Sequence, residues 1–177
     1  MEPESKMEWK PMTLSEARSL KDNKVIRIYT DGVYDLFHPG HTEQLRQAKE
    51  AFPRVHLIVG VCSDADTLEV KKCLPIMNET ERVNMIKQCK YVDEVYPCPP
   101  FFPTLEFVNS LKVDLVAHDA IPYSSPDSPD CYEVFKLADR FLETIRTPEI
   151  STTALLNRIL NNIETIRERQ AFRCVSE

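Results

Sequence analysis

The sequence has few of the residues that mark several common classes of protein. Its six cysteines form no CxxC pair and no cluster with histidine at zinc-ligand spacing, so a structural zinc site is not expected. No run approaches the ~20 apolar residues that a membrane-spanning helix needs. Residues 1–12 lack the apolar core of a signal peptide. The cysteines are therefore expected to be reduced thiols in a cytoplasmic protein.

Basic residues are also fewer than acidic residues. Lysine and arginine number 22 against 28 aspartates and glutamates, which gives a net charge of −6. The basic surface of a nucleic-acid-binding protein is therefore not expected. An acidic protein can still bind the phosphates of a nucleotide, because a few local cations and helix N-termini are sufficient.

Glycine and histidine are scarce, and their distribution is uneven. The 177 residues include three glycines and four histidines. Gly32, His38, Gly40 and His41 all fall within ten residues. Packing alone does not account for that concentration. The segment 25–41, VIRIYTDGVYDLFHPGH, is therefore the first candidate for a functional site.

The remaining composition, 42% hydrophobic and 28% charged, is that of one soluble globular domain. We expect a polar lead-in over residues 1–24, the folded domain over residues 25–170 and a short tail over residues 171–177. The lead-in is predicted to contain a short helix that begins near Thr13.

Short apolar runs alternate with helical patterns along the chain. They predict strands at 25–29, 55–61, 91–95, 113–117 and 141–145, and helices at about 41–52, 78–89, 104–111, 132–138 and 152–170. Residues 63–66 are interpreted as a turn that opens a long connection to residue 77. This alternation predicts an α/β fold, a Rossmann-like doubly wound parallel sheet of about five strands. Right-handed crossovers then place the ligand crevice at the carboxyl ends of the strands.

The last predicted helix, over residues 152–170, has leucine and isoleucine at helical spacing and mixed charges elsewhere. We expect it to pack on the core or to flank a dimer. We expect no membrane-binding helix in this chain.

The HPGH segment has the residues of a phosphate site. Gly40 allows close approach of the backbone, and the helix that follows offers free N–H groups at its positive end. His38 and His41 can lie on one side of the first helical turn and stabilise charge that develops on transferring oxygens. A two-histidine metal pair is the alternative, although the sequence offers no obvious third ligand nearby.

HPGH between a strand and a helix resembles the HxGH signature of the nucleotidyltransferase superfamily. Together with YVDEV (91–95), VAHDAIPY (116–123) and RTPEISTT (146–153), the segment TDGVYDLFHPGH (30–41) resembles the CTP:phosphocholine cytidylyltransferases. The resemblance covers about residues 24–167. It implies transfer of the cytidylyl group from CTP to phosphocholine, giving CDP-choline and pyrophosphate, with Mg²⁺ carried by CTP. The attacking phosphate oxygen is already anionic, so that reaction needs positioning and charge stabilisation rather than a general base.

The resemblance also implies roles for individual residues. Lys71 matches a lysine that bridges the phosphates of both substrates, and Lys72 stays an alternative because the family usually has Lys-Gly there. The implied catalytic residues are His38, His41, Lys71 and Arg146. The implied CTP-binding residues are Gly32, Val33, Tyr34, His41, His118, Asp119, Arg146, Thr147, Ile150, Ser151 and Thr152.

A quaternary ammonium group cannot donate hydrogen bonds, so aromatic faces and a nearby carboxylate suit it. The implied phosphocholine-binding residues are Asp31, Lys71, Phe101, Tyr123 and Tyr132. Phe101 stands where the family usually has tryptophan, which is the stronger cation–π partner. Phosphocholine is still favoured, because Tyr123 belongs to the IPY of the choline-type motif. Phosphoethanolamine and glycerol 3-phosphate remain alternative acceptors.

Three further departures from the family pattern stand out. Lys90 replaces a frequent arginine, and Ala120 replaces a common aspartate. Pro148-Glu149 replaces the usual Glu-Gly, which puts the backbone shape of that loop in question. These departures are the only support for a different class, a nucleotide-binding module without catalysis. YVDEV resembles a segment that packs between the family's subunits, which implies a homodimer.

Overall fold

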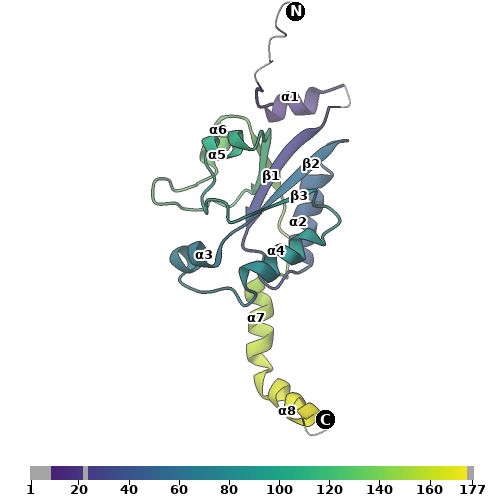
Figure 1. Cartoon of the computed structure of the whole chain (residues 1–177), viewed down its shortest axis with the longest axis vertical. Helices are drawn as coiled ribbons and strands as arrows, with labels where there is room; N and C mark the ends of the chain where they lie inside the picture. The colour runs from purple at the N-terminus through teal and green to yellow at the C-terminus, as the bar shows by residue number, and fades with distance from the viewer. Residues whose placement is uncertain (1–8, 22–23, 175–177) are drawn as a thin grey trace, which may run out of the picture.

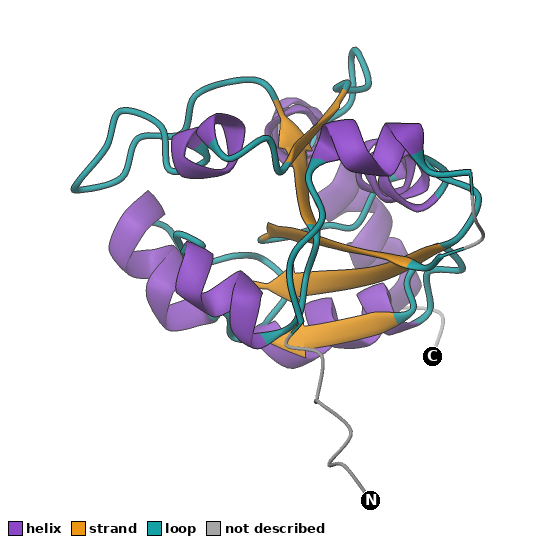
Figure 2. Ribbon diagram, turned by 90° about the horizontal axis from the view of Figure 1, so that it is seen from above, coloured by secondary structure: helices purple, strands orange, loops and turns teal. Residues whose placement is uncertain are grey.

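The computed structural model describes residues 9–21 and 24–174. Parts of the expected lead-in (1–8 and 22–23) and of the expected tail (175–177) lie outside the described residues. The centre of the molecule is a sheet, with helices packed on both of its faces (Figures 1 and 2).

The sheet has five parallel strands in the order β3-β2-β1-β4-β5. They are β1 (Ile26–Gly32), β2 (Val55–Val61), β3 (Glu94–Pro97), β4 (Leu115–Asp119) and β5 (Phe141–Thr144). This order confirms the Rossmann-like prediction. The direction in which the chain adds strands reverses between β1 and β4, and such folds bind ligands at that point. The strands β3 and β4 begin later than predicted, because residues 91–93 and 113–114 turn into the sheet before pairing.

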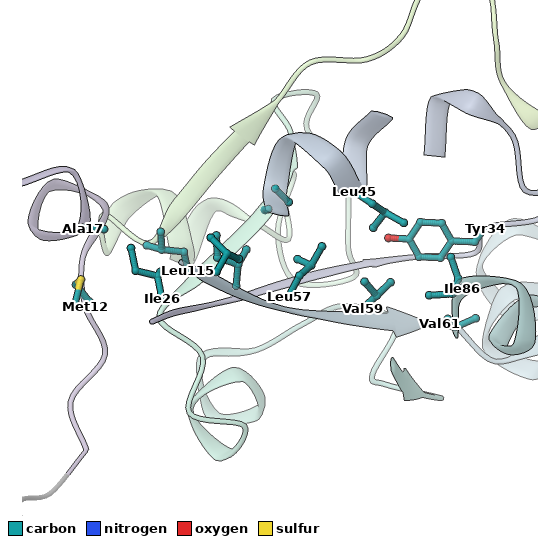
Figure 3. Packing of buried hydrophobic residues seen from close by; sticks show 14 of the residues in the cluster. Met12, Ala17, Ile26, Tyr34, Leu45, Leu57, Val59, Val61, Ile86 and Leu115 are labelled. Carbon is teal, nitrogen blue, oxygen red and sulfur yellow. The ribbon is translucent and has the colours of Figure 1, made fainter. Parts of the chain in front are cut away.

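Side chains alternate across the strands and build two cores. In β2, Leu57 and Val59 face one core whereas Ile58 faces the other. The helices α2 (Pro39–Lys49) and α4 (Glu79–Lys87) cover the first face, and α5 (Leu105–Ser110) and α6 (Glu133–Leu137) cover the second. Figure 3 shows the first core running from Met12 and Ala17 at one end to Tyr34 at the other. The short helix α1 (Leu14–Ser19) begins beside Thr13 as predicted, with Thr13 as its cap, and it closes the end of this core away from Tyr34.

Residues 64–71 correct the sequence-based prediction. They were expected to be a turn and connection, but they form the helix α3 (Asp64–Lys71). Ser63 caps it by accepting a hydrogen bond from the Asp66 amide, 3.0 Å away. The helix buries only Thr67, so it has no apolar stripe for periodicity to detect.

The C-terminal helix also differs from the prediction. It is broken at Asn162 into α7 (Thr152–Asn161) and α8 (Ile163–Cys174), and α8 continues past the expected end near residue 170. Neither helix packs into the core, because α7 has no buried residue and both helices project away from the sheet (Figure 1). Within residues 9–21 and 24–174, no helix has the length and apolar character needed to cross a bilayer.

Candidate active site

A cavity of about 840 Å³ opens at the carboxyl ends of β1 and β4, where the strand order reverses. Every residue that the sequence predicted for the site lines this one cavity. Lys72, the alternative to Lys71, does not line it. The α/β topology accounts for the convergence, because each predicted motif follows the end of a strand.

His38 and His41 form a stacked pair in the wall of the cavity. Their ring centroids are 3.7 Å apart and their planes differ by 17°. Both ring nitrogens of His38 and the Nδ1 of His41 are buried without a hydrogen-bond partner. His38 is the N-cap of α2, and no side chain caps this helix terminus. Two imidazoles with unpartnered ring nitrogens therefore lie beside a positive helix end in the wall of the cavity.

Burial makes the neutral form of both histidines the favoured one. Loss of water, together with the charges of His38 and Lys71, lowers the pKa of His41 from 6.5 to about 3. Burial also lowers the pKa of His38. A neutral imidazole donates one N–H, so the pair can bind phosphate oxygens at neutral pH without carrying charge.

Gly40 explains why the pair can approach the neighbouring loop so closely. A Cβ on Gly40 would lie 3.0 Å from the His38 ring and 3.2 Å from the Ile150 side chain. Any other residue at position 40 would therefore push apart the α2 terminus and the loop that carries Arg146.

A second group of side chains lies at the carboxyl ends of β1 and β4, in another part of the same cavity. The Tyr132 hydroxyl donates to Asp31 Oδ1 at 2.9 Å. The His118 ring stacks on Tyr132 at 4.6 Å and meets the edge of Tyr123 at 4.8 Å. Burial raises the pKa of Asp31 to about 7, despite the hydrogen bond from Tyr132. The group combines aromatic faces with one carboxylate whose charge is poorly compensated, which suits an organic cation.

Asp119 and Arg146 connect this group to the last loop. The Arg146 Nε donates to Asp119 Oδ2 at 2.8 Å, and its Nη2 donates to the Tyr123 hydroxyl. Tyr123 in turn donates to Asp119 Oδ2 at 3.4 Å. The Arg146 side chain remains 60% exposed, so its guanidinium is still open to a phosphate. The Thr147 hydroxyl beside it is buried without a partner.

Two residues that hold the site together were not predicted from the sequence. The first is Arg82 of α4, which is fully buried. Its guanidinium donates to the carbonyls of Met77 (3.1 Å) and Val33 (2.6 Å) and to Asp64 Oδ1 (2.7 Å). It therefore links the β1–α2 loop to the start of α3, the helix that ends with Lys71.

The second is Asp35, where three loops meet. Its carboxylate accepts the amides of Ile76 (2.9 Å) and Met77 (2.8 Å), and its carbonyl accepts the Thr152 hydroxyl (3.0 Å). An aspartate in a loop after a strand was a detectable signal, but its partners lie 41, 42 and 117 residues away. Local sequence carries no information on contacts of that range.

The loop of Pro148-Glu149 adopts the shape that the missing glycine would favour. Glu149 has a φ of 62°, in the left-handed region that costs a non-glycine residue about 1 kcal/mol. Its carbonyl accepts a hydrogen bond from Arg158, 3.3 Å away in α7. Glu149 in place of glycine therefore keeps the left-handed backbone conformation of the loop and adds strain.

The sequence of this chain is similar to a family model and to several known proteins. A family model described as "Cytidylyltransferase-like" matches residues 29–158. The chain is 44% identical over 155 residues to a probable choline-phosphate cytidylyltransferase of Schizosaccharomyces pombe, covering 88% of this chain and 42% of that protein. It is 44% identical over 163 residues to human choline-phosphate cytidylyltransferase A, covering 92% of this chain and 44% of that protein. The chain thus spans less than half the length of these two relatives.

Proteins with a different acceptor are less similar. The mouse ethanolamine-phosphate cytidylyltransferase is 38% identical over 139 residues, covering 78% of this chain and 34% of that protein. Among solved structures, a lipopolysaccharide core biosynthesis protein from Thermoplasma volcanium aligns with a TM-score of 0.54 at 22% identity. That alignment covers 69% of this chain and 98% of the other, and it supports the fold alone.

Proposed function

Since the chain belongs to the cytidylyltransferase-like family, we propose that it transfers the cytidylyl group of CTP to phosphocholine, giving CDP-choline and pyrophosphate. The observation that carries this proposal is the stacked His38–His41 pair, which has unpartnered ring nitrogens and lines the same cavity as Lys71 and Arg146. The greater identity to choline-type than to ethanolamine-type relatives supports the choice of acceptor.

The reaction that we propose is an in-line displacement. An oxygen of the phosphocholine phosphate forms a bond to the α-phosphorus of CTP, and the bond to the β-phosphate oxygen breaks as pyrophosphate leaves. No proton has to move, because the nucleophile is anionic and pyrophosphate can leave as an anion. His38 and His41 donate hydrogen bonds to the phosphate oxygens of CTP, and Lys71 and Arg146 supply positive charge.

The other half of the cavity receives the acceptor. Choline would lie against Tyr123, Tyr132 and Phe101, with Asp31 balancing its charge. His118 and Asp119 at the end of β4, and residues 150–152 at the start of α7, would contact the nucleotide. These assignments combine the position of each residue with the role that the family resemblance implies.

We propose that Mg²⁺ enters with CTP and stays on its phosphates. The three aspartates that line the cavity are already engaged by the Tyr132 hydroxyl, by Arg146 or by backbone amides. Among the described residues, no group of three or more His, Cys, Asp or Glu side chains has the geometry to hold a metal ion. The ion would neutralise part of the triphosphate charge.

We also propose that the chain is a homodimer and works in the cytoplasm. A depression of about 390 Å³ lies beside His38, between α2 and Tyr91 of the YVDEV segment, and it offers a surface for a second copy. Light scattering on the purified chain tests the dimer. The structure has free thiols at Cys62, Cys73, Cys89, Cys98 and Cys131, in keeping with a reducing compartment.

One experiment tests the activity directly. The purified chain is mixed with CTP, Mg²⁺ and, in turn, phosphocholine, phosphoethanolamine or glycerol 3-phosphate, and pyrophosphate release is followed. We expect release with phosphocholine at the highest kcat/KM, and a kcat/KM at least about 100-fold lower from a His41→Ala preparation purified in parallel. Preference for another acceptor would refute the choline assignment. CTP binding without release from any acceptor would refute the enzymatic proposal.

A further inference from the structure

Two tyrosines of the cavity, Tyr123 and Tyr132, stand at the two ends of one loop, residues 123–132. The Cys131 amide donates to the Tyr123 carbonyl at 2.8 Å and closes the neck of the loop. Further out, the Ser125 amide donates to the Ser128 carbonyl at 2.8 Å and closes the tip. The loop therefore leaves the cavity at Tyr123 and returns to it at Tyr132.

Asp130 holds both ends of this loop with a single oxygen. Its Oδ1 accepts the amide of Tyr132 at 3.1 Å and the amide of Tyr123 at 3.3 Å. Its Oδ2 accepts a hydrogen bond from Lys136 Nζ at 2.6 Å. The Asp130 side chain is only 13% exposed, yet it does not line the cavity.

The backbone of Asp130 is itself fixed by the loop. Its amide donates to Ser128 Oγ at 3.1 Å, and the same hydroxyl donates to the Asp130 carbonyl at 2.9 Å. Partial burial raises the pKa of Asp130, but the hydrogen bonds from Lys136 and from the two tyrosine amides outweigh it and lower the pKa overall. The carboxylate is therefore ionised at neutral pH and is a strong acceptor for both amides.

The rings of the two tyrosines depend on where their backbones are held. His118 lies against both rings, and each hydroxyl reaches a different aspartate, Asp31 or Asp119. The ring centroids of Tyr123 and Tyr132 are 6.1 Å apart, with their planes nearly perpendicular. Cation–π contact falls off beyond about 6 Å from a ring centroid, so a small change in this spacing matters to a quaternary ammonium group.

We propose that Asp130 is a positioning residue for acceptor selection, which fixes the spacing of the Tyr123 and Tyr132 rings by binding both of their amides. The inference rests on the proposed function. It concerns a residue that touches neither substrate. A primary ammonium group donates hydrogen bonds to a carboxylate and depends less on the ring spacing, so loss of Asp130 should affect phosphocholine more than phosphoethanolamine.

The test measures kcat/KM for phosphocholine and for phosphoethanolamine in Asp130→Ala. We expect the ratio of the two values to fall about tenfold, the effect of losing the net contribution of roughly two hydrogen bonds. Asp130→Asn keeps an acceptor for both amides and should restore the ratio to within about threefold of wild type. A merely structural role would lower both values together and leave the ratio unchanged, which would overturn the proposal.

Two control variants separate the amide contacts from general effects of charge. Asp127→Ala removes the same charge from an exposed position of the same loop, where the described structure gives the side chain no hydrogen bond or ion pair. Lys136→Met removes the ion pair and leaves both amide contacts. We expect ratios within about twofold of wild type in both variants, because exposed charges and partly exposed ion pairs contribute little. A tenfold fall in either control would overturn the proposal.

A separate probe distinguishes this inference from the proposed function. If the wild-type chain does not use phosphocholine, the proposed function fails, and binding of tetramethylammonium chloride then decides the role of Asp130. Binding followed by NMR should be at least about fivefold weaker in Asp130→Ala than in Asp127→Ala. Equal binding in the two variants, or none in the wild type, would overturn the inference.

Discussion

The imidazole rings of His38 and His41 stack with centroids 3.7 Å apart and lie beside the N-terminus of α2, which has no side-chain cap. Two imidazolium ions at that distance would repel each other, and both rings are largely removed from water. The pair is therefore suited to donate hydrogen bonds in the neutral state. It is poorly suited to transfer protons.

Replacing His41 by alanine should remove the activity and leave the fold intact. We expect kcat/KM to fall at least ~100-fold, because a preorganised donor to the developing charge is lost. His56→Ala is the matched control, since His56 lies outside the cavity and pairs with Glu94 at 3.0 Å. Circular dichroism checks the fold of both variants. Near-native turnover in His41→Ala would refute the role assigned to it.

The depressed pKa of His41 predicts that acid destabilises the ligand-free protein. The pKa is about 3 in the folded state against 6.5 ordinarily, so the unfolded chain binds more protons between these two pH values. Stability should therefore fall as the pH drops below about 6.5, by at most about 1.4 kcal/mol per pH unit from this group.

Urea denaturation of the wild type and of His41→Asn, at pH 7 and at pH 5.5, isolates this contribution. The comparison is needed because Asp31 acts with the opposite sign, its raised pKa favouring the folded state at lower pH. The variant should lose less stability on acidification than the wild type. Parallel pH dependence in the two proteins would contradict the pKa assigned to His41.

Asp31 should make acceptor binding depend on pH near neutrality. Its pKa of about 7 leaves the carboxyl group largely protonated at pH 6 and largely ionised at pH 8. Only the ionised form balances the charge of choline, so the KM for phosphocholine should fall about tenfold over this range. In the Asp31→Asn variant the phosphate of phosphocholine titrates as it does with the wild type, but the carboxylate is absent. If it shows the same fall, the effect belongs to the substrate and not to Asp31.

Arg82 and Arg46 should differ sharply in their contribution to stability, although each makes three hydrogen bonds through its guanidinium. Arg82 is fully buried, and Arg82→Ala leaves two carbonyls and the Asp64 carboxylate without their donor. We expect a loss of about 3–5 kcal/mol from such a site.

The Arg46→Ala variant removes surface ion pairs to Glu43 and Glu50, and it should cost less than about 1 kcal/mol. The free energies of unfolding in urea test the comparison. Equal losses in the two variants would show that the Arg82 contacts are weaker than their geometry indicates.

Glycine at position 149 should stabilise the protein. Glu149 adopts a left-handed φ of 62°, which glycine reaches without steric cost. We expect Glu149→Gly to gain about 0.5–1 kcal/mol, because relief of strain is partly offset by the greater freedom of glycine in the unfolded chain. Glu149→Ala retains the strain and is the control. Equal thermal stability of the two variants would contradict this account.

Sequence reasoning was most successful where periodicity and caps are strong. The apolar run 55–61 became β2 with the predicted bounds. The helix α4 begins at the predicted place, where Asn78 caps it and the Asn78 amide donates to Glu81. The convergence of the site residues on one cavity followed from topology, because all strands are parallel.

The failures have physical causes in particular residues. The start of α3 has residues typical of a helix N-terminus, with Ser63 as cap and Asp64 and Asp66 in the first turn. This helix is held by its caps and by Arg82 rather than by an apolar stripe. The burial of Arg82 was not expected, since arginine is seldom buried unless paired. The leucine and isoleucine pattern of 152–170 continues across Asn162, so periodicity did not reveal that the helix breaks there.

Asp35 joins three segments of the cavity wall, so we expect these segments to open together. Asp35 belongs to the β1–α2 loop. It forms hydrogen bonds with the segment that carries Ile76 and Met77 and with the first turn of α7. Detaching the segment of Ile76 and Met77 exposes the Asp35 carboxylate, and detaching α7 exposes the Asp35 carbonyl. The amides of Ile76 and Met77 should therefore exchange with solvent in step, and slow down together when a nucleotide occupies the cavity. Occupancy of the site can thus be followed at two amides on its rim.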